Sequence, residues 1–207
     1  PDLALRNVSP FWLPRDAAAG NDVALKSGDV AFLTGPNAAG KSTLLRSLGA
    51  AALLSACGLR APVDGGTAPP LDGLVLRSPR GDAPVFGKSA FAVEMDDLAQ
   101  LLDECTARSL VLVDELGRGT SAREGAAVGA AVLCEFRERR YTGVFATHLH
   151  EILDVLGDDA PATLKPWRMG AGGDGGAAFR VEAGVCTDSR ALEAAARAGV
   201  PAGLVAR

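Results

Sequence analysis

The sequence lacks the features of a membrane protein, a secreted disulfide scaffold or a zinc protein. No apolar run approaches the roughly 18 residues that a membrane-spanning helix needs. The four cysteines lie far apart and form no CxxC pair, which argues against both a disulfide framework and a zinc site. We therefore expect reduced thiols and an intracellular compartment.

An excess of basic charge is also missing. The 207 residues carry a formal net charge of −4 and have a pI near 5.2, so the total charge shows no footprint for nucleic acid. Hydrophobic residues at 48% and charged residues at 22% describe an ordinary soluble globular protein, long enough for one large domain. The chain begins at Pro1 rather than at a methionine and shows no signal or transit segment. We therefore expect a piece of a larger protein, with any targeting information outside it.

What the sequence does contain is a glycine-rich loop between a strand pattern and a helix pattern. The apolar, partly β-branched run Val30–Thr34 predicts a buried strand, and a helical pattern opens at Leu44. Between them stands GxxxxGKS, the pattern of a phosphate-binding P-loop, whose backbone N–H groups form a concave anion site. We predict that Lys41 reaches the β- and γ-phosphates of a nucleoside triphosphate and that Ser42 ligates Mg²⁺. The predicted nucleotide-binding residues are Gly35, Pro36, Asn37, Ala38, Ala39, Gly40, Lys41, Ser42 and Thr43.

Strand and helix patterns alternate along the rest of the chain. This alternation predicts an α/β fold with a central, mostly parallel sheet flanked by helices. We expect strands at 3–5, 21–27, 30–34, 74–76, 110–113 and 143–146, and helices at 42–57, 91–107, 121–140 and 187–198. The Pro- and Gly-rich residues 60–72 are expected to form a loop, and the glycine-rich residues 170–176 a hairpin tip or linker.

A pair of acidic residues follows the most apolar of these strands. Asp114 and Glu115 come directly after Leu110–Val113, a run typical of a central parallel strand covered on both faces. Residues at the carboxyl end of such a strand lie beside the P-loop, where ligands bind in these folds. We expect Asp114 to hold Mg²⁺, directly or through water, and Glu115 to orient or deprotonate the attacking water. Paired acids at this place indicate hydrolysis rather than storage of the nucleotide.

Two further segments reach the same edge of the predicted sheet. In the turn after the acidic pair, Thr120 or Ser121 is expected to cap the next helix. His148 then ends the strand that follows, where a histidine can hydrogen-bond the γ-phosphate or the attacking water. We predict that His148 senses intact nucleotide, and that His150 is exposed without such a role.

Together these motifs resemble the MutS family of DNA mismatch-repair ATPases, a branch of the ABC-type P-loop proteins. The resemblance is carried by TGPNAAGKST at 34–43, GKSAFAVEM at 87–95, LVLVDELGRGTS at 110–121, FATHLHEI at 145–152 and the tail GVCTDSRALEAAARAGVP at 184–201. It implies a P-loop NTPase fold of the ABC-ATPase type and a Mg²⁺-dependent ATPase whose hydrolysis is coupled to mismatched DNA. Residues 1–207 would form the C-terminal ATPase domain, with the DNA-binding, lever and clamp domains outside this chain.

The resemblance also implies partners and a compartment. Two ATPase domains pair in the family as a homo- or heterodimer, so Ser89 of the signature segment would reach the γ-phosphate held by the other protomer. The alternative role for Ser89 is to cap the helix at 91–107. Residues 44–59, 147–150 and 185–201 look closest to the organellar MutS homologues of plants and algae, which implies a mitochondrion or chloroplast. A nuclear or bacterial MutS relative is the alternative.

Three positions depart from the family pattern. Ala39 stands where glycine or serine is usual, Glu193 where many members carry a histidine near the base, and no aromatic is evident at 17–20. The departures near the base, at 193 and at 17–20, motivate an alternative function, a nucleotide-gated DNA-recombination surveillance module whose hydrolysis is incidental. An ABC transporter or chromosome-structure ATPase would carry an LSGGQ-like loop ahead of the strand at 110–113, and nothing at 78–109 resembles one.

The acidic balance predicts that this chain by itself holds duplex DNA weakly. Because few phosphates are neutralised, retention should be lost by about 0.2 M salt, as measured by fluorescence anisotropy of a labelled duplex during a salt titration. Tight binding that survives this salt concentration would show that the chain carries its own DNA-gripping surface.

Overall fold

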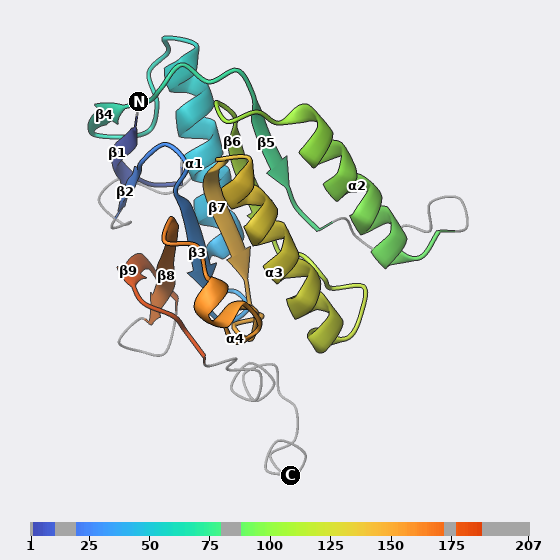
Figure 1. Ribbon diagram of the computed structural model, residues 1–207. Coiled ribbons are helices and arrows are strands. Elements are labelled where there is room, and N and C mark those ends of the chain that lie inside the picture. The colour runs from blue at the N-terminus through green and yellow to red at the C-terminus, as the bar shows by residue number, and fades with distance from the viewer. Residues whose placement is uncertain (1, 11–19, 80–87, 172–176, 188–207) are drawn as a thin grey trace.

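The computed structural model of the chain describes residues 2–10, 20–79, 88–171 and 177–187. Six strands in these residues form one sheet in the order β5-β6-β7-β3-β8-β9 (Figure 1). The strands from β5 to β8 pair in parallel, and β9 runs antiparallel to β8. The bounds are β3 (Val30–Thr34), β5 (Leu74–Arg77), β6 (Leu110–Asp114), β7 (Thr142–Thr147), β8 (Leu164–Ala171) and β9 (Ala177–Ala183).

Helices cover both faces of this sheet, as the alternating pattern predicted. One face carries α1 (Lys41–Ala56) and a small antiparallel sheet in the order β2-β1-β4. The other face carries α2 (Ala90–Glu104), α3 (Ala122–Glu138) and the short α4 (Ile152–Leu156), which is followed by the 3-10 turn η1 (Gly157–Asp159). The strands of the small sheet are β1 (Leu3–Val8), β2 (Asn21–Leu25) and β4 (Gly65–Thr67).

Strand β3 shows how one apolar run serves both layers. Its Ala31 and Leu33 pack into the core beneath α1, whereas Val30 and Phe32 pack into the core beneath α2 and α3. Phe32 stacks on Phe145, its register partner on β7, with ring centroids 6.2 Å apart. Every residue of β3 is buried, as expected of a central parallel strand with helices on both sides.

Most predicted elements are confirmed with small shifts at their ends. Strand β3 has the predicted bounds, whereas α2 ends at Glu104 rather than at 107 because Cys105 turns to an extended backbone. The prediction of a loop at 60–72 was wrong in part, because this segment contains β4. The prediction of a hairpin tip or linker at 170–176 was also wrong in part, because β8 includes Gly170 and Ala171. Strands β8 and β9 and helix α4 were not predicted. The predicted helix at 187–198 begins at the last described residue, so from 188 on it lies outside the described residues, as do residues 172–176.

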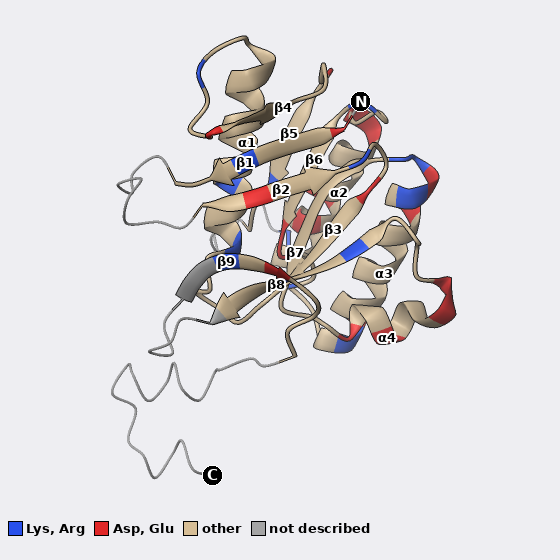
Figure 2. Cartoon of the chain, turned by 90° about the vertical axis from the view of Figure 1, so that its left-hand side faces the viewer, with Lys and Arg blue, Asp and Glu red and all other residues tan. Residues whose placement is uncertain are grey.

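Surface charge is mixed rather than segregated. In the view of Figure 2, basic and acidic segments are interspersed over the described elements, which agrees with the small net charge. Among the described helices, none combines the length and the apolar character required to cross a bilayer.

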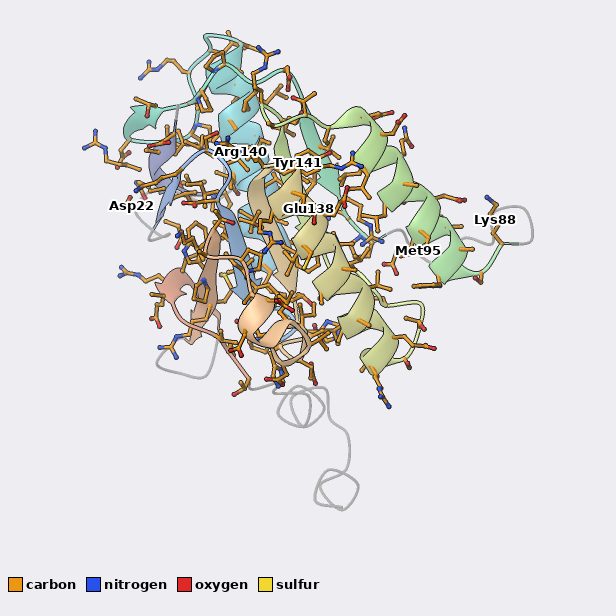
Figure 3. All side chains as sticks on the ribbon, viewed as in Figure 1. Asp22, Lys88, Met95, Glu138, Arg140 and Tyr141 are labelled. Carbon is orange, nitrogen blue, oxygen red and sulfur yellow. The ribbon has the colours of Figure 1, made fainter. Side chains whose placement is uncertain are left out.

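A left-handed residue ends helix α3. Arg140 has a φ of 58°. Its N–H donates to the carbonyl of Arg137 at 3.1 Å, and the N–H of Tyr141 donates to the carbonyl of Phe136 at 2.9 Å, the bonds of a Schellman cap. The reversal carries Tyr141 into the core, where its hydroxyl donates to the carbonyl of Cys105 at the end of α2 (Figure 3).

This cap predicts a stabilising substitution. Arg140→Gly is expected to raise the free energy of unfolding by about 1 kcal/mol relative to Arg140→Ala, because only glycine adopts this φ without a clash at Cβ. Both variants remove the same exposed side chain, so their difference in urea denaturation isolates the backbone effect. A glycine variant no more stable than the alanine variant would contradict the assignment.

Candidate nucleotide-binding site

Three strand ends meet at one edge of the large sheet. The register places Thr34 of β3 level with Thr147 of β7, and Ala146 of β7 level with Asp114 of β6. The chain leaves these strands into the P-loop, the acidic pair and the histidine turn. The predicted site residues from three distant segments therefore lie at the same edge, where α1 and α3 begin (Figure 1).

The P-loop backbone surrounds an open helix start. Ala38 and Gly40 both have positive φ, 63° and 98°, which turns the chain tightly into α1. Gly40 is the N-cap of α1 and supplies no side-chain hydrogen bond, and the first turn of α1 contains no acidic residue. The first backbone N–H groups of α1 are thus left without a cap and available to an anion such as a phosphate.

Two small residues, Gly35 and Ala39, allow the P-loop to pack closely against the sheet. A Cβ on Gly35 would lie 3.0 Å from Cβ of Met169, so the loop passes close over β8. Ala39 is buried and packs in the core beneath α1. The departure from glycine or serine at position 39 therefore adds a methyl group to the core rather than to the anion site.

Lys41 is almost fully buried. Its Nζ donates to the carbonyls of Gly35 and Pro36 at 2.7 and 3.1 Å and lies 3.9 Å from Oε1 of Glu115. Burial lowers the pKa of Lys41, and the charges of Glu115 and Asp114 act in the opposite direction. The loop's own carbonyls thus hold the ammonium between the helix start and the acidic pair.

Asp114 is buried with an unsatisfied oxygen. Its side chain is 2% exposed, and within the described residues its Oδ1 has no hydrogen-bond partner. Burial raises the pKa of Asp114, while the Ser42 hydroxyl lowers it. A buried carboxylate oxygen is costly unless a donor or cation meets it. The Asp114 carboxylate and the Ser42 hydroxyl are oxygen ligands of the type that Mg²⁺ prefers, so these residues fit the ion.

Glu115 has a strained backbone and a charged environment. Its φ of 52° costs on the order of 1–2 kcal/mol for a residue with a Cβ. Three cationic or ionisable groups, on Arg118, His148 and Lys41, lie 3.4, 3.7 and 3.9 Å from its carboxylate. The His148 imidazole, followed by the Lys41 charge, lowers the pKa of Glu115. The carboxylate is therefore ionised at neutral pH.

The two histidines differ in their surroundings. Thr147 is buried, and its hydroxyl accepts the N–H of Leu149 at 2.9 Å, which fixes the turn that presents His148 to Glu115. His150 has Glu151 as its neighbour instead, with Nδ1 3.8 Å from the carboxylate. It is half-buried rather than exposed, which corrects the sequence-based expectation.

The predicted helix caps are present. Ser89 is exposed, and its Oγ accepts the N–H of Ala92 at 3.2 Å, so it caps α2. Ser121 rather than Thr120 caps α3, in a reciprocal capping box with Glu124. Gly87, Glu193 and residues 17–19 lie outside the described residues.

Other residues support the strands and turns that carry the site, and the sequence analysis did not predict them. The Thr34 hydroxyl donates to the carbonyl of Trp167 and accepts the N–H of Cys186, which ties β3 to β8 and to the segment after β9. Arg77 and Glu94 form a buried ion pair at the acidic turn. Each residue gives only a weak signal, Arg77 as the end of a strand and Glu94 as an acidic residue on the buried side of a helix, and no spacing in the sequence pairs them.

Comparisons with known proteins agree with these motifs. The family model of MutS domain V matches residues 31–207. The mitochondrial DNA mismatch repair protein MSH1 of Arabidopsis thaliana is 37% identical over 99% of this chain and 18% of its own length. The DNA mismatch repair protein MutS of Thermus aquaticus is 42% identical over 86% of this chain and 22% of its own length. The chain thus spans about a fifth of the length of these relatives.

The buried carboxylate predicts a substitution that stabilises the ligand-free chain. Because folding raises the pKa of Asp114, the folded state binds the proton more tightly, and this residue lowers stability as the pH rises through the raised pKa. Asp114→Asn should therefore raise the free energy of unfolding at pH 7 by on the order of 1 kcal/mol. The gain should shrink as the pH falls toward the ordinary Asp pKa of about 3.9, as followed by urea denaturation at several pH values.

Asp72 is the matched control. Hydrogen bonds from Thr106 and Ser109 lower the pKa of Asp72, so Asp72→Asn should lower stability at pH 7 instead. Effects of the same sign at both positions, or a gain at Asp114 that does not change with pH, would contradict this electrostatic account.

Proposed function

The chain belongs to the MutS family of DNA mismatch-repair proteins, and on that premise we propose that it binds ATP with Mg²⁺ and couples hydrolysis to the recognition of mismatched DNA. Domain V, which the chain matches, is the ATPase domain of the family and has the P-loop NTPase fold. The observation that carries the proposal is the meeting of Lys41, Asp114 and Glu115 beside an uncapped helix start. We also propose that these residues form the C-terminal ATPase domain of a longer protein.

Ser42 and Asp114 would hold the metal ion. Bound there, Mg²⁺ would neutralise negative charge on the phosphate oxygens. The N–H groups of the P-loop and the first turn of α1 would hold the β- and γ-phosphates, and Lys41 would move from the carbonyls of Gly35 and Pro36 toward them. In this role the loop carbonyls keep the Lys41 ammonium in place before nucleotide arrives.

Glu115 would act on the attacking water. Its lowered pKa keeps the carboxylate ionised, so it accepts a hydrogen bond from water without first having to lose a proton. The same lowered pKa makes it a weak base, which favours aiming the water over complete removal of its proton in the ground state. His148, which lies 3.7 Å away, would contact the γ-phosphate or the same water.

A second ATPase domain would complete the site. Ser89 is exposed at the start of α2, so its hydroxyl is accessible to a γ-phosphate bound by a partner domain. We propose that ATP joins two such domains and that this closure changes how DNA-binding domains outside this chain hold a mismatched duplex. The alternative, suggested by the departures at position 193 and at 17–20, is a recombination surveillance module that is gated by nucleotide and hydrolyses it incidentally.

We propose an organellar location for the parent protein. The relative from A. thaliana is named as mitochondrial, and its similarity spans 99% of this chain, whereas that of the T. aquaticus protein spans 86%. The organelle is a mitochondrion or a chloroplast, the nucleus is the alternative, and imaging of the tagged full-length protein distinguishes them.

Replacing Glu115 tests the proposed chemistry. In the full-length dimer, Glu115→Gln should keep ATP binding, measured by calorimetry with Mg²⁺, because the amide preserves size and leaves the P-loop unchanged. Hydrolysis should slow by about 10²–10⁴-fold, the typical contribution of a positioned acid or base. Glu151→Gln is the matched control, since Glu151 also faces a histidine but lies outside the site, and it should retain full activity.

Three outcomes test these proposals. Unchanged turnover in Glu115→Gln would remove Glu115 from its role, and absence of ATP binding by the unmodified protein would remove the enzyme assignment. If Glu115→Gln stops hydrolysis and still supports mismatch repair in cells, hydrolysis is incidental and the alternative function is favoured.

A further inference from the structure

A buried ion pair stands next to the nucleotide site without belonging to it. Nη2 of Arg77, at the end of β5, lies 2.6 Å from Oε1 of Glu94 on α2, and each side chain is 7% exposed. By contrast, Lys88, just before α2, and Asp96 of α2 form a pair that is more than half exposed, and Lys88 lies away from the sheet (Figure 3). Exposed pairs of that type contribute little to stability. Burying the charges of Arg77 and Glu94 costs desolvation energy in addition, so stability alone does not explain this pair.

The ion pair makes hydrogen bonds to the backbone of residues 114–117, which we call the acidic turn, on both sides of Leu116. Nη1 of Arg77 donates to the carbonyl of Glu115 and lies 3.5 Å from that of Asp114. The second carboxylate oxygen of Glu94 accepts the N–H of Gly117 at 3.0 Å. The peptide groups before and after Leu116 are thus fixed by one pair of side chains. This turn contains the left-handed backbone of Glu115, a conformation that persists only when its surroundings hold it.

The same pair connects the turn to the helix that presents Ser89. Glu94 lies in the first half of α2, which Ser89 caps. The turn also abuts the first turn of α2, because a Cβ on Gly119 would lie 2.6 Å from the backbone N of Phe91. A shift of α2 therefore moves Glu94 and Phe91 together against the segment that carries Glu115.

We propose that Arg77 and Glu94 are positioning residues that transmit the placement of α2, and hence of Ser89, to Glu115. The inference rests on the proposed ATPase function. Binding of a partner domain's nucleotide at Ser89 would then change the position of the Glu115 carboxylate in the same chain. Neither residue touches nucleotide in this arrangement; both act through the peptide groups of residues 114–117.

Charge is needed for this role and not for filling space. Two apolar side chains of similar volume would pack between β5 and α2 without the desolvation penalty of a buried ion pair. They would not donate to the carbonyl of Glu115 or accept from the N–H of Gly117. An apolar replacement therefore separates the positioning role from a purely structural one.

The test uses the full-length dimer with Arg77→Lys, Glu94→Gln and the double variant Arg77→Met/Glu94→Met. Each should fold and bind ATP with KM changed less than about threefold, while kcat falls by about 10- to 100-fold, as expected for misplacement of a catalytic group. The control is Arg139→Lys, because Arg139 likewise bridges a carboxylate and a carbonyl, those of Glu135 and Leu102, far from the site. That variant should leave kcat and KM unchanged.

A double-mutant cycle with Ser89→Ala tests the transmission. The loss of kcat caused by Ser89→Ala in the native background should largely disappear in the Glu94→Gln background, because that variant no longer connects α2 to residues 114–117. Independent, multiplying losses, or a Ser89→Ala variant with native kcat, would overturn the link to α2. Native kcat in the Arg77→Met/Glu94→Met double variant would overturn the positioning role. Absence of ATP binding by the unmodified protein would end the proposed function, whereas an inactive Glu115→Gln variant beside a fully active double variant would end only this inference.

Discussion

The in-register parallel pairing of β6, β7 and β3 is the constraint on which the site depends. Because these strands end level with one another, the segments after Thr34, Asp114 and Thr147 emerge at a single edge. No side chain of the site could be brought there by local sequence alone, since the three segments are far apart along the chain. The apolar cores on both faces, with Phe32 stacked on Phe145 between neighbouring strands, hold this register and make it a property of the whole sheet.

The arrangement of the site lowers the stability of the fold when no ligand is bound. Lys41 and Asp114 are both buried, and burial moves the pKa of each toward the neutral form. Glu115 adds a strained backbone. Buried charges of both signs are unfavourable in an empty site, and a phosphate and a cation together would meet them. We therefore propose that the arrangement favours a metal-bound triphosphate over an anion or a cation alone.

The sequence predicted the elements whose patterns are local and missed those that depend on a neighbour. Val30–Thr34 is an uninterrupted apolar run, and its bounds were predicted without error. Strand β8 contains Lys165, Pro166 and Gly170, a composition untypical of strands, and it is extended because it pairs with β3. The segment that includes β4 is rich in proline and glycine, and β4 exists through its pairing with β1. The P-loop, the acidic pair and His148 were found by motif and position, whereas Arg77 and Glu94 were not, because an ion pair between a strand end and a helix has no spacing that a sequence reveals.

If two domains share the site as proposed, that ion pair explains why polar groups are needed beside the Glu115 backbone. Apolar packing fixes the distance between α2 and the sheet, but it tolerates small rotations of a peptide plane because dispersion has little directionality. A guanidinium has a planar fork of donors, so one arginine can face Glu94 and the carbonyl of Glu115 in a single geometry. The orientation of the Glu115 peptide sets where its carboxylate points. A directional connection is therefore what allows the position of Ser89, at the surface where a partner would bind, to determine the aim of a carboxylate inside the site.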